Sequence, residues 1–338
     1  MKNKKLLIFG SIVILIVLFF VIINIIPPTK VVENNLFVVE EGSLPMVVAH
    51  RGGKVLNPEN TIKAFDASVE EYDVDVLEMD LCLTKDRELV IIHNLYVEKN
   101  CDATQFFNKK EDEHIYVNDY TYEELLQLNF GYKFEAIDGT KPYENILDGV
   151  DASNRSKVIK ENNLNIVKIE ELFGRYYTLY PNLKYIVEIK NDGDLGKYAA
   201  DILNKLLTKE YPNLQDKVVI GTFHTEISNY LESKYPHLLT GASVGTAAKF
   251  IFTQMLGVNL FYNGSFTCLQ IPTSYTLKKV TIKLTKQNYI SRAHLRNIAV
   301  QVWTINDADD MRMLIDLKVD AIMTDNPKLL HEVLQEYK

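Results

Sequence analysis

Residues 46–81 read MVVAHRGGKVLNPENTIKAFDASVEEYDVDVLEMDL, and this stretch decides the fold class. It begins with the apolar run Met46–His50, continues through a helical pattern over Thr61–Tyr72, and ends with a second apolar run, Asp75–Leu81. Short runs of this kind, rich in valine, fit strands that are buried on both faces of a parallel sheet. A strand, a helix and a second strand in this order predict an α/β fold.

The same alternation continues to the carboxyl terminus. Further strand candidates are Leu89–His93, Lys184–Lys190, Lys217–Gly221, His237–Ala242, Phe266–Ile271, Ala299–Ile305 and Asp320–Met323. Further helix candidates are Leu195–Thr208, Gln287–Asn297, Ala308–Leu317 and Pro327–Gln335. The pattern predicts a (β/α)8 barrel of the TIM type, and because one strand is in excess, we expect one to be peripheral. The connection before Leu89 is too short for an ordinary helical crossover, which leaves either a hairpin or an unusually short crossover.

The amino-terminal end carries a long apolar segment. Residues Leu6–Ile26 contain no charged side chain, and a helix of this length, at about 1.5 Å per residue, spans about 30 Å of hydrocarbon. The segment ends at a Pro-Pro pair without the small residues of a signal-peptide cleavage site, so we expect an uncleaved anchor. Lys2, Lys4 and Lys5 precede it, which by the positive-inside rule predicts a single-pass cell-membrane protein with a cytoplasmic amino terminus and an extracytoplasmic catalytic domain.

These signals divide the chain into parts. We expect residues 1–30 to form the cytoplasmic tip and transmembrane anchor, residues 31–44 a tether, and residues 45–338 the barrel. An acidic, Tyr-rich and Asn-rich stretch at about 94–168 interrupts the barrel pattern and predicts an inserted subdomain or lid. The apolar stretch Phe250–Tyr262 is interpreted as a core-facing helix and loop rather than an element that dips into a membrane.

Composition excludes several classes of function. The chain has 338 residues and a formal net charge of −8, with no basic run beyond its first residues, so nucleic-acid binding has no electrostatic support. The cysteines are Cys82, Cys101 and Cys268, an odd number without CxxC spacing, which disfavours a zinc site or a disulfide framework.

Polar groups follow the apolar runs at the strand ends. In (β/α)8 barrels the carboxyl ends of the strands converge on one face, where catalytic residues gather. Glu78 and Asp80 are two residues apart, so on a strand both point to the same side. Two neighbouring carboxylates repel each other unless a cation joins them or one keeps its proton. Together with Glu188 they supply three hard oxygen ligands, which suit Ca²⁺ or Mg²⁺ rather than Zn²⁺.

Basic side chains stand at the same ends. His50 and His93 titrate near neutrality, as proton transfer to and from the oxygens of a phosphate ester requires. Lys190 shares the face of Glu188 and would pair with a phosphate oxygen, and Arg51 offers a fork of donors for such oxygens.

Several blocks of the chain resemble the glycerophosphodiester phosphodiesterase family. The residues that carry the resemblance are His50–Gly52, Pro58–Thr61, Glu78–Asp80, Thr84–Asp86, His93, Glu188–Lys190, Trp303–Asn306 and Ile322–Pro327. The resemblance covers the chain from about Pro45 onward, apart from much of the insertion. It implies a barrel fold and the hydrolysis of glycerophosphodiesters to glycerol 3-phosphate and an alcohol.

The resemblance also implies roles for single residues. The metal ligands would be Glu78, Asp80 and Glu188, the acid/base pair His50 and His93, and the substrate contacts Arg51, Lys190 and Trp303. Glu59 and Asn60 would either contact and orient the Arg51 side chain or cap the amino terminus of the helix that starts at Thr61. The chain departs from the family where Asn94 replaces the Asp that usually follows the second histidine, and the Arg-Thr block after it is missing.

Two other functions stay open from the sequence. A lysophospholipase D-type or phospholipase-like enzyme acting on membrane lipid is suggested by the anchor and the apolar 250–262 stretch. A non-catalytic phosphate- or carbohydrate-binding barrel is suggested only by the departures around Asn94.

Overall fold

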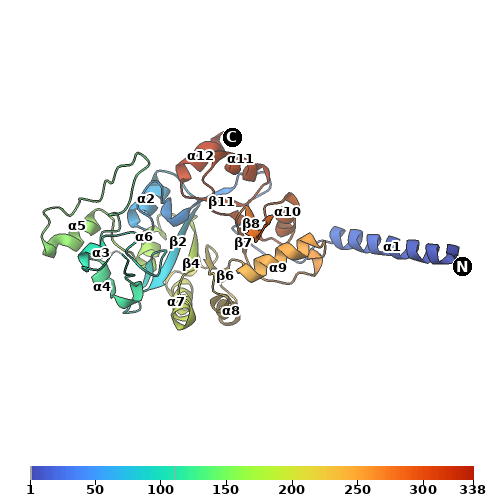
Figure 1. Cartoon of the computed structure of the whole chain (residues 1–338), viewed down its shortest axis with the longest axis horizontal. Helices are drawn as coiled ribbons and strands as arrows, with labels where there is room; N and C mark the ends of the chain where they lie inside the picture. The colour runs from blue at the N-terminus through green and yellow to red at the C-terminus, as the bar shows by residue number, and fades with distance from the viewer. Residues whose placement is uncertain (1, 111) are drawn as a thin grey trace.

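Eight parallel strands form a nearly closed barrel in the computed structural model, which describes residues 2–110 and 112–338 (Figure 1). The barrel strands are β1 (Met46–Ala49), β2 (Val76–Leu83), β4 (Lys184–Ile189), β5 (Val218–Gly221), β6 (Leu239–Thr240), β7 (Cys268–Ile271), β10 (Ala299–Val302) and β11 (Ala321–Thr324). They pair in the order β6-β5-β4-β2-β1-β11-β10-β7, and a parallel bridge between Gly241 and Cys268 joins the two ends. The predicted (β/α)8 architecture is confirmed.

The ninth strand is the peripheral one. Strand β3 (Leu89–Ile91) lies outside the barrel order and pairs antiparallel with β2, with Leu83 opposite Leu89. The short connection is therefore a hairpin, which resolves the alternative that the sequence left open.

Helices cover the outside of the barrel. They are α2 (Ile62–Glu70), α6 (Ile169–Tyr176), α7 (Gly193–Lys205), α8 (Thr225–Lys234), α9 (Val244–Met255), α10 (Gln287–Leu295), α11 (Ala308–Asp316) and α12 (Pro327–Gln335). The chain also contains a π-turn at Leu206–Glu210 and the 3-10 turns His50–Gly52, Val117–Asp119, Ala152–Asn154, Pro212–Leu214 and Asn259–Phe261. Local chemistry fixes the helix starts: the Thr61 side chain accepts a hydrogen bond from the Ala64 N–H, and Asn326 does the same for Leu329 before α12.

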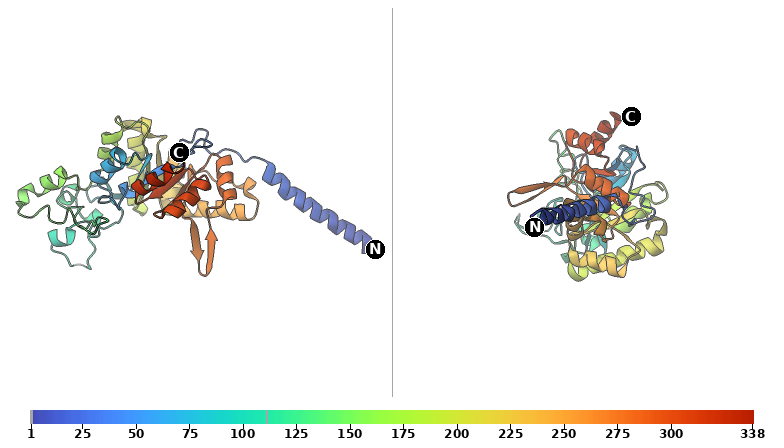
Figure 2. Two further views of the ribbon diagram at one scale, coloured as in Figure 1. Left: turned by 90° about the horizontal axis from the view of Figure 1, so that it is seen from above. Right: turned by 90° about the vertical axis from the view of Figure 1, so that its right-hand side faces the viewer.

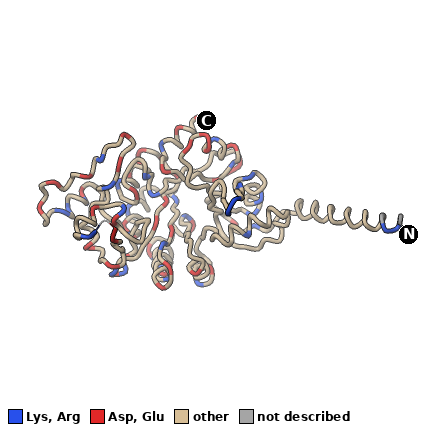
Figure 3. Tube along the Cα trace, in the orientation of Figure 1, with Lys and Arg blue, Asp and Glu red and all other residues tan. Residues whose placement is uncertain are grey.

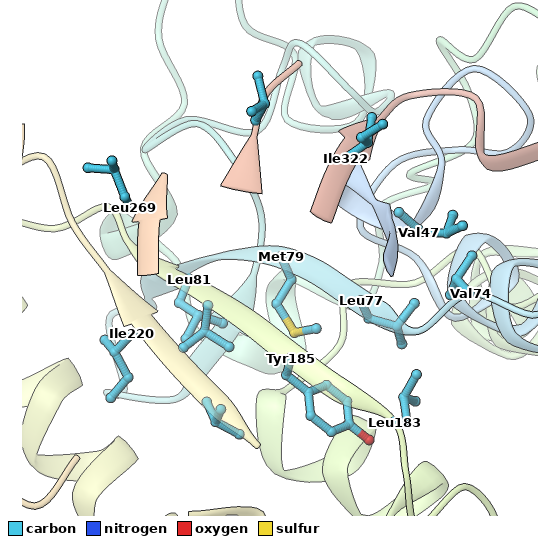
Figure 4. Close-up of a cluster of buried hydrophobic side chains, with 14 of the residues drawn as sticks. Val47, Val74, Leu77, Met79, Leu81, Leu183, Tyr185, Ile220, Leu269 and Ile322 are labelled. Atoms are coloured by element: carbon cyan, nitrogen blue, oxygen red, sulfur yellow. The ribbon is translucent and has the colours of Figure 1, made fainter. Parts of the chain in front are cut away.

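Alternate residues of the barrel strands face opposite sides, toward the surrounding helices or toward the barrel axis. Leu77, Met79 and Leu81 lie on one side of β2, where they pack with Tyr185 against the surrounding helices (Figure 4). The alternate residues of each strand face the barrel axis. The lower part of this interior is apolar and is filled by Met46, Val48, Val76, Ile186, Val219, Cys268, Ala299, Ala321 and Met323. The polar residues at the strand ends also face the barrel axis, and they lie nearer the carboxyl ends of the strands than this apolar cluster.

The segment expected as a tether is packed against the barrel. Phe37 has no exposed surface and belongs to the interior cluster, and the Asn35 side chain donates to the backbone oxygens of Thr267 and Asn297. The Val39 N–H donates to the Asp320 carboxylate. Residues 31–44 therefore pack on the barrel, with Phe37 buried in its interior cluster and Leu36 exposed.

The stretch 94–168 carries an apolar cluster of its own. Its helices are α3 (Ala103–Phe106), α4 (Tyr122–Leu125) and α5 (Arg155–Glu161). The cluster includes Leu125, Leu128 and Phe130 and packs against Val90 and Ile92, beside β2. It stands at the end of the molecule away from the amino-terminal helix (Figure 1).

Two elements project from the barrel. Helix α1 (Lys2–Ile25) contains a 19-residue span, Leu7–Ile25, which is long and apolar enough to cross a membrane, as signal sequences near an amino terminus also are. Figure 3 shows it without charge beyond its amino-terminal end. The hairpin of β8 (Ser274–Leu277) and β9 (Val280–Lys283), which the sequence pattern did not predict, forms a small separate sheet (Figure 2).

Candidate active site

His50 is oriented by a carboxylate from the last barrel strand. Strands β1 and β11 pair with Ala49 opposite Thr324, so the next residues, His50 and Asp325, stand side by side. The His50 Nδ1 lies 2.5 Å from the Asp325 Oδ1, and its Nε2 lies 3.9 Å from the Glu78 Oε2. One ring nitrogen is thus held by Asp325 while the other faces the interior, an arrangement suited to proton transfer.

Asp325 is held as a charged group. Its second oxygen accepts a hydrogen bond of 2.8 Å from the Asn306 amide and lies 3.5 Å from the Lys54 Nζ. Burial acts to raise the pKa of Asp325, but the hydrogen bond and the charge of His50 outweigh it, and the pKa is lowered. Asp325 lies in the stretch Ile322–Pro327 that resembles the family, but no role was predicted for it from the sequence, although it too is a polar residue at the end of a strand.

The three expected metal ligands meet on two neighbouring strands. Asp80 of β2 pairs directly with Glu188 of β4, and Glu78 lies one inward-facing position earlier. Glu78 and Asp80 are buried, and the Arg51 backbone N–H donates to Glu78 over 2.8 Å. Burial, followed by repulsion from Asp80, raises the pKa of Glu78 well above its ordinary value. Burial also raises the pKa of Glu188, against the opposing charge of Lys190.

Two cationic side chains stand among these carboxylates. The Lys190 Nζ lies 2.7 Å from Glu188 and 3.4 Å from Asp80. Burial works against the charged amine, but these two carboxylates together raise the pKa of Lys190. The Arg51 Nη1 donates to both oxygens of Glu59 at 3.2 Å, and its Nε lies 3.4 Å from Asp80. Of the two supporting residues suggested by the sequence, Glu59 therefore contacts Arg51 directly.

The residues fit a divalent cation, although they do not form a ready-made cage. In residues 2–110 and 112–338, no group of three or more His, Cys, Asp or Glu side chains is arranged to hold a metal ion. Lys190 shares the space between Glu188 and Asp80. Burial, together with repulsion from Asp80, nevertheless raises the pKa of both Glu78 and Glu188, and a nearby cation would favour their charged forms. Among the described residues none donates to the buried Asn60 Oδ1, and the amide nitrogen of the same side chain donates to Asp80 over 3.3 Å.

His93 completes the polar side of the site. It follows β3 and lines the same cavity as His50. Burial lowers the pKa of His93, with Asp80 acting in the opposite direction. Its Nδ1 lies 3.1 Å from the Asn94 Oδ1, so the residue that departs from the family pattern still offers an oxygen to this ring, although an uncharged one.

One side of a cavity of about 1050 Å³ is polar and is lined by His50, Arg51, Lys54, Glu78, Asp80, His93, Glu188 and Lys190. The other side is apolar: α9 contributes Ile251, Phe252 and Met255, and the β8–β9 hairpin contributes Tyr275, Leu277 and Ile282. Trp303 lies at the cavity wall, with its ring edge-to-face with Phe223 at 6.2 Å between centroids. Phe250–Tyr262 is only partly the core-facing segment that was expected, since Phe250 is buried while Phe252 is largely exposed.

Comparison with known proteins points to one family. Residues 50–329 match the model of the glycerophosphoryl diester phosphodiesterase family. A glycerophosphodiester phosphodiesterase of Caldanaerobacter subterraneus is 26% identical over 293 residues, which cover 86% of this chain and 98% of that protein. The solved structure of a glycerophosphoryl diester phosphodiesterase domain from Mycobacterium tuberculosis superposes with a TM-score of 0.65 at 17% identity, covering 87% of this chain and 100% of that one. An Oleispira antarctica phosphodiesterase solved in complex with the product sn-glycerol-3-phosphate gives a TM-score of 0.58 at 19% identity, covering 86% and 97%.

Proposed function

Because this chain belongs to the glycerophosphoryl diester phosphodiesterase family, we propose that it hydrolyses glycerophosphodiesters to glycerol 3-phosphate and an alcohol, with His50 and His93 as the acid/base pair. The enzyme class, a phosphoric diester hydrolase, follows from the family itself. The observation that carries the mechanism is that two imidazoles, three carboxylates, Lys190 and Arg51 line one cavity at the carboxyl ends of the strands. The product bound in the Oleispira antarctica structure supports glycerol 3-phosphate as the product here.

The charged residues bind and orient the phosphodiester. Lys190 presents a primary amine, and Arg51 a planar fork, to the non-bridging oxygens of the substrate. Glu59 fixes the Arg51 guanidinium from the side, so little side-chain freedom is lost when an anion binds. A divalent cation held by Glu78, Asp80 and Glu188, Ca²⁺ or Mg²⁺, would supply the remaining positive charge at the phosphate.

The histidines divide the proton transfers. The lowered pKa of His93 keeps its ring neutral at physiological pH, so His93 suits the general base that takes a proton from the attacking oxygen, either water or a neighbouring hydroxyl of the substrate. His50 is bonded to the charged Asp325, which stabilises an imidazolium, so His50 suits the acid that protonates the leaving oxygen. Before the next turnover, His93 would release the proton it gained and His50 would regain the proton it lost.

A pair of alanine variants tests this assignment. His50→Ala and His93→Ala should each abolish release of glycerol 3-phosphate from glycerophosphocholine, and EDTA should abolish it in the unmutated enzyme. His237→Ala is the matched control, because His237 bonds to Asn204 away from the cavity. Activity within twofold of the unmutated enzyme in either active-site variant would sink the acid/base assignment.

Helix α1 supports a membrane location. We propose that Leu7–Ile25 spans the cell membrane and stays attached, with Lys4 and Lys5 on the cytoplasmic side and the barrel outside. Protease added to intact cells should digest the barrel and leave a short amino-terminal tag protected. A mature protein that begins after residue 26 would show instead that the helix is a cleaved signal sequence.

The apolar side of the cavity favours a second candidate substrate. A soluble glycerophosphodiester is polar throughout and leaves the wall of α9 and the hairpin without a partner, whereas a lysophospholipid would place its acyl chain there. The comparison to make is kcat/KM for lysophosphatidylcholine against glycerophosphocholine. If Phe252→Ser lowers kcat/KM equally for the two substrates, the acyl chain of the lysophospholipid is not bound at this wall. A non-catalytic barrel has no such support, because both histidines and all three carboxylates line the cavity.

A further inference from the structure

The β8–β9 hairpin stands apart from the rest of the fold. It forms a two-stranded sheet of its own, and all of its strand residues except Ile282 are exposed. Figure 2 shows it projecting from the barrel on the half of the molecule that carries α1. A two-stranded hairpin alone in water is marginally stable, so one that extends this far is expected to meet a partner.

The composition of the hairpin indicates what that partner is. Tyr275, Leu277 and Val280 each expose more than half of their surface. The segment 274–286 reads SYTLKKVTIKLTK, with four lysines and no Asp or Glu, in a chain whose net charge is −8. Within the described part of the chain, none of these lysines forms an ion pair with a carboxylate. Exposed aliphatic and tyrosine side chains among unpaired lysines fit the surface of an anionic lipid bilayer.

The apolar surface continues from the hairpin toward α1. Along the cavity mouth, α9 exposes Phe252 and Met255, and beyond its end Phe261 is exposed as well. Phe261 stacks on Phe19 of α1 with 6.4 Å between the ring centroids, and the Asn24 side chain of α1 donates to the Gly257 backbone oxygen. The exposed apolar side chains of α9 and Phe261 thus continue to the apolar helix.

We propose that the β8–β9 hairpin docks on an anionic lipid bilayer, with Leu277 and Val280 entering the interface and the lysines contacting lipid phosphates, so that the cavity opens toward the bilayer. This contact is additional to the proposed anchoring by α1 and does not depend on the proposed catalysis. Figure 2 shows the hairpin and α1 leaving the barrel in different directions, so docking requires the barrel to rotate at the segment that follows Ile25, and this rotation separates Phe261 from Phe19 and Gly257 from Asn24. Pro27 and Pro28, which cannot continue the helix, lie at that joint.

A fluorescent probe at the hairpin tests the proposal in the full-length protein. The three native cysteines are buried, so Val280→Cys provides a single accessible thiol for an environment-sensitive dye. The protein is placed in nanodiscs of phosphatidylglycerol and phosphatidylcholine, or of phosphatidylcholine alone, with and without lipids that carry a quencher. Leu179→Cys is the matched control, since Leu179 is also an exposed aliphatic residue but lies in the loop before β4, at the other end of the strand from the cavity.

Docking should shift the emission of the Val280 probe to the blue and give at least twofold quenching in the anionic discs, with no change at position 179. Adding Lys278→Glu and Lys279→Glu should remove most of this quenching, and thermal unfolding of each labelled variant checks that it is folded. An unquenched Val280 probe in anionic discs would overturn the proposal, as would equal quenching in phosphatidylcholine or after charge reversal. Recovery of the protein with the discs reports on α1, and turnover of glycerophosphocholine reports on catalysis, so failure of either is distinguished from failure of docking.

Discussion

Replacing Asp325 by Asn isolates the charge that orients His50. The amide keeps the shape of the side chain and an oxygen that accepts from the His50 Nδ1, but it removes the negative charge 2.5 Å from the ring. A hydrogen bond to a charged group contributes about 1.5–3 kcal/mol, and each ~1.4 kcal/mol is tenfold in rate, so we expect kcat/KM to fall about 10- to 150-fold. The loss should appear in kcat and not in KM, because the charge supports the protonated His50 ring that delivers the proton to the leaving oxygen, and His50 is not one of the groups proposed to bind the phosphodiester.

The assay is steady-state release of glycerol 3-phosphate from glycerophosphocholine, with thermal unfolding measured in parallel. Asp325 also accepts from Asn306, so a small drop in melting temperature is expected, and activity is compared well below it. Asp201→Asn serves as the control, because Asp201 accepts from Tyr230 and Tyr235 outside the cavity. A value of kcat/KM within twofold of the unmutated enzyme, with Asp201→Asn behaving alike, would refute the positioning role of Asp325.

Three further predictions follow from the site. Burial lowers the pKa of His93, so its neutral, base-competent form persists below the ordinary value, and the acidic limb of the pH profile of kcat/KM should lie below about pH 6.5; a limb above that value contradicts the role of base. Lys190→Gln should raise KM for the diester about tenfold or more, while calorimetry without substrate should show tighter Ca²⁺ or Mg²⁺ binding, because the lysine no longer competes for Glu188; weaker ion binding would show that these carboxylates are not the ligands. Gly52→Ala should cost about 1–3 kcal/mol of stability, since Gly52 has φ +76° and the added Cβ would lie 2.9 Å from a neighbouring side chain; Gly139→Ala, at φ +80° with open space around it, measures the backbone strain alone, and equal losses would rule out the close contact.

The strand ends were predictable because burial leaves a strong pattern in the sequence. A run such as Val76–Leu81 is apolar except at Glu78 and Asp80, and carboxylates in a strand buried on both faces require a special explanation. The regular alternation of strands and helices supplied the barrel, and the barrel brought these positions together. Residue type and strand period were sufficient for that step.

The hairpin and Asp325 could not be predicted, for two different reasons. The hairpin turn is Leu277-Lys278-Lys279-Val280, with Lys278 at φ +55°, so it lacks the Gly or Asn that marks such a turn in sequence. Asp325 follows a strand candidate, but it also directly precedes Asn326 and Pro327, which are typical of a helix start and do begin α12. The pattern around Asp325 therefore has an explanation that needs no role in the site. Which side chain it serves depends on the pairing of β1 with β11, strands that lie at opposite ends of the barrel sequence.

Charge balance connects the carboxylates to the reaction. Around the two histidines, Glu59, Glu78, Asp80, Glu188 and Asp325 outnumber the cations Arg51, Lys54 and Lys190. A phosphodiester is itself an anion, and in a partly buried site it would be repelled by this excess. The protein alone can relieve the repulsion only by protonating a carboxyl, which is what the raised pKa of Glu78 describes. A divalent cation would relieve this repulsion without a proton and would leave both histidines free for the proposed proton transfers. Because the two-residue spacing places the carboxylates side by side, we expect substrate binding to require such an ion.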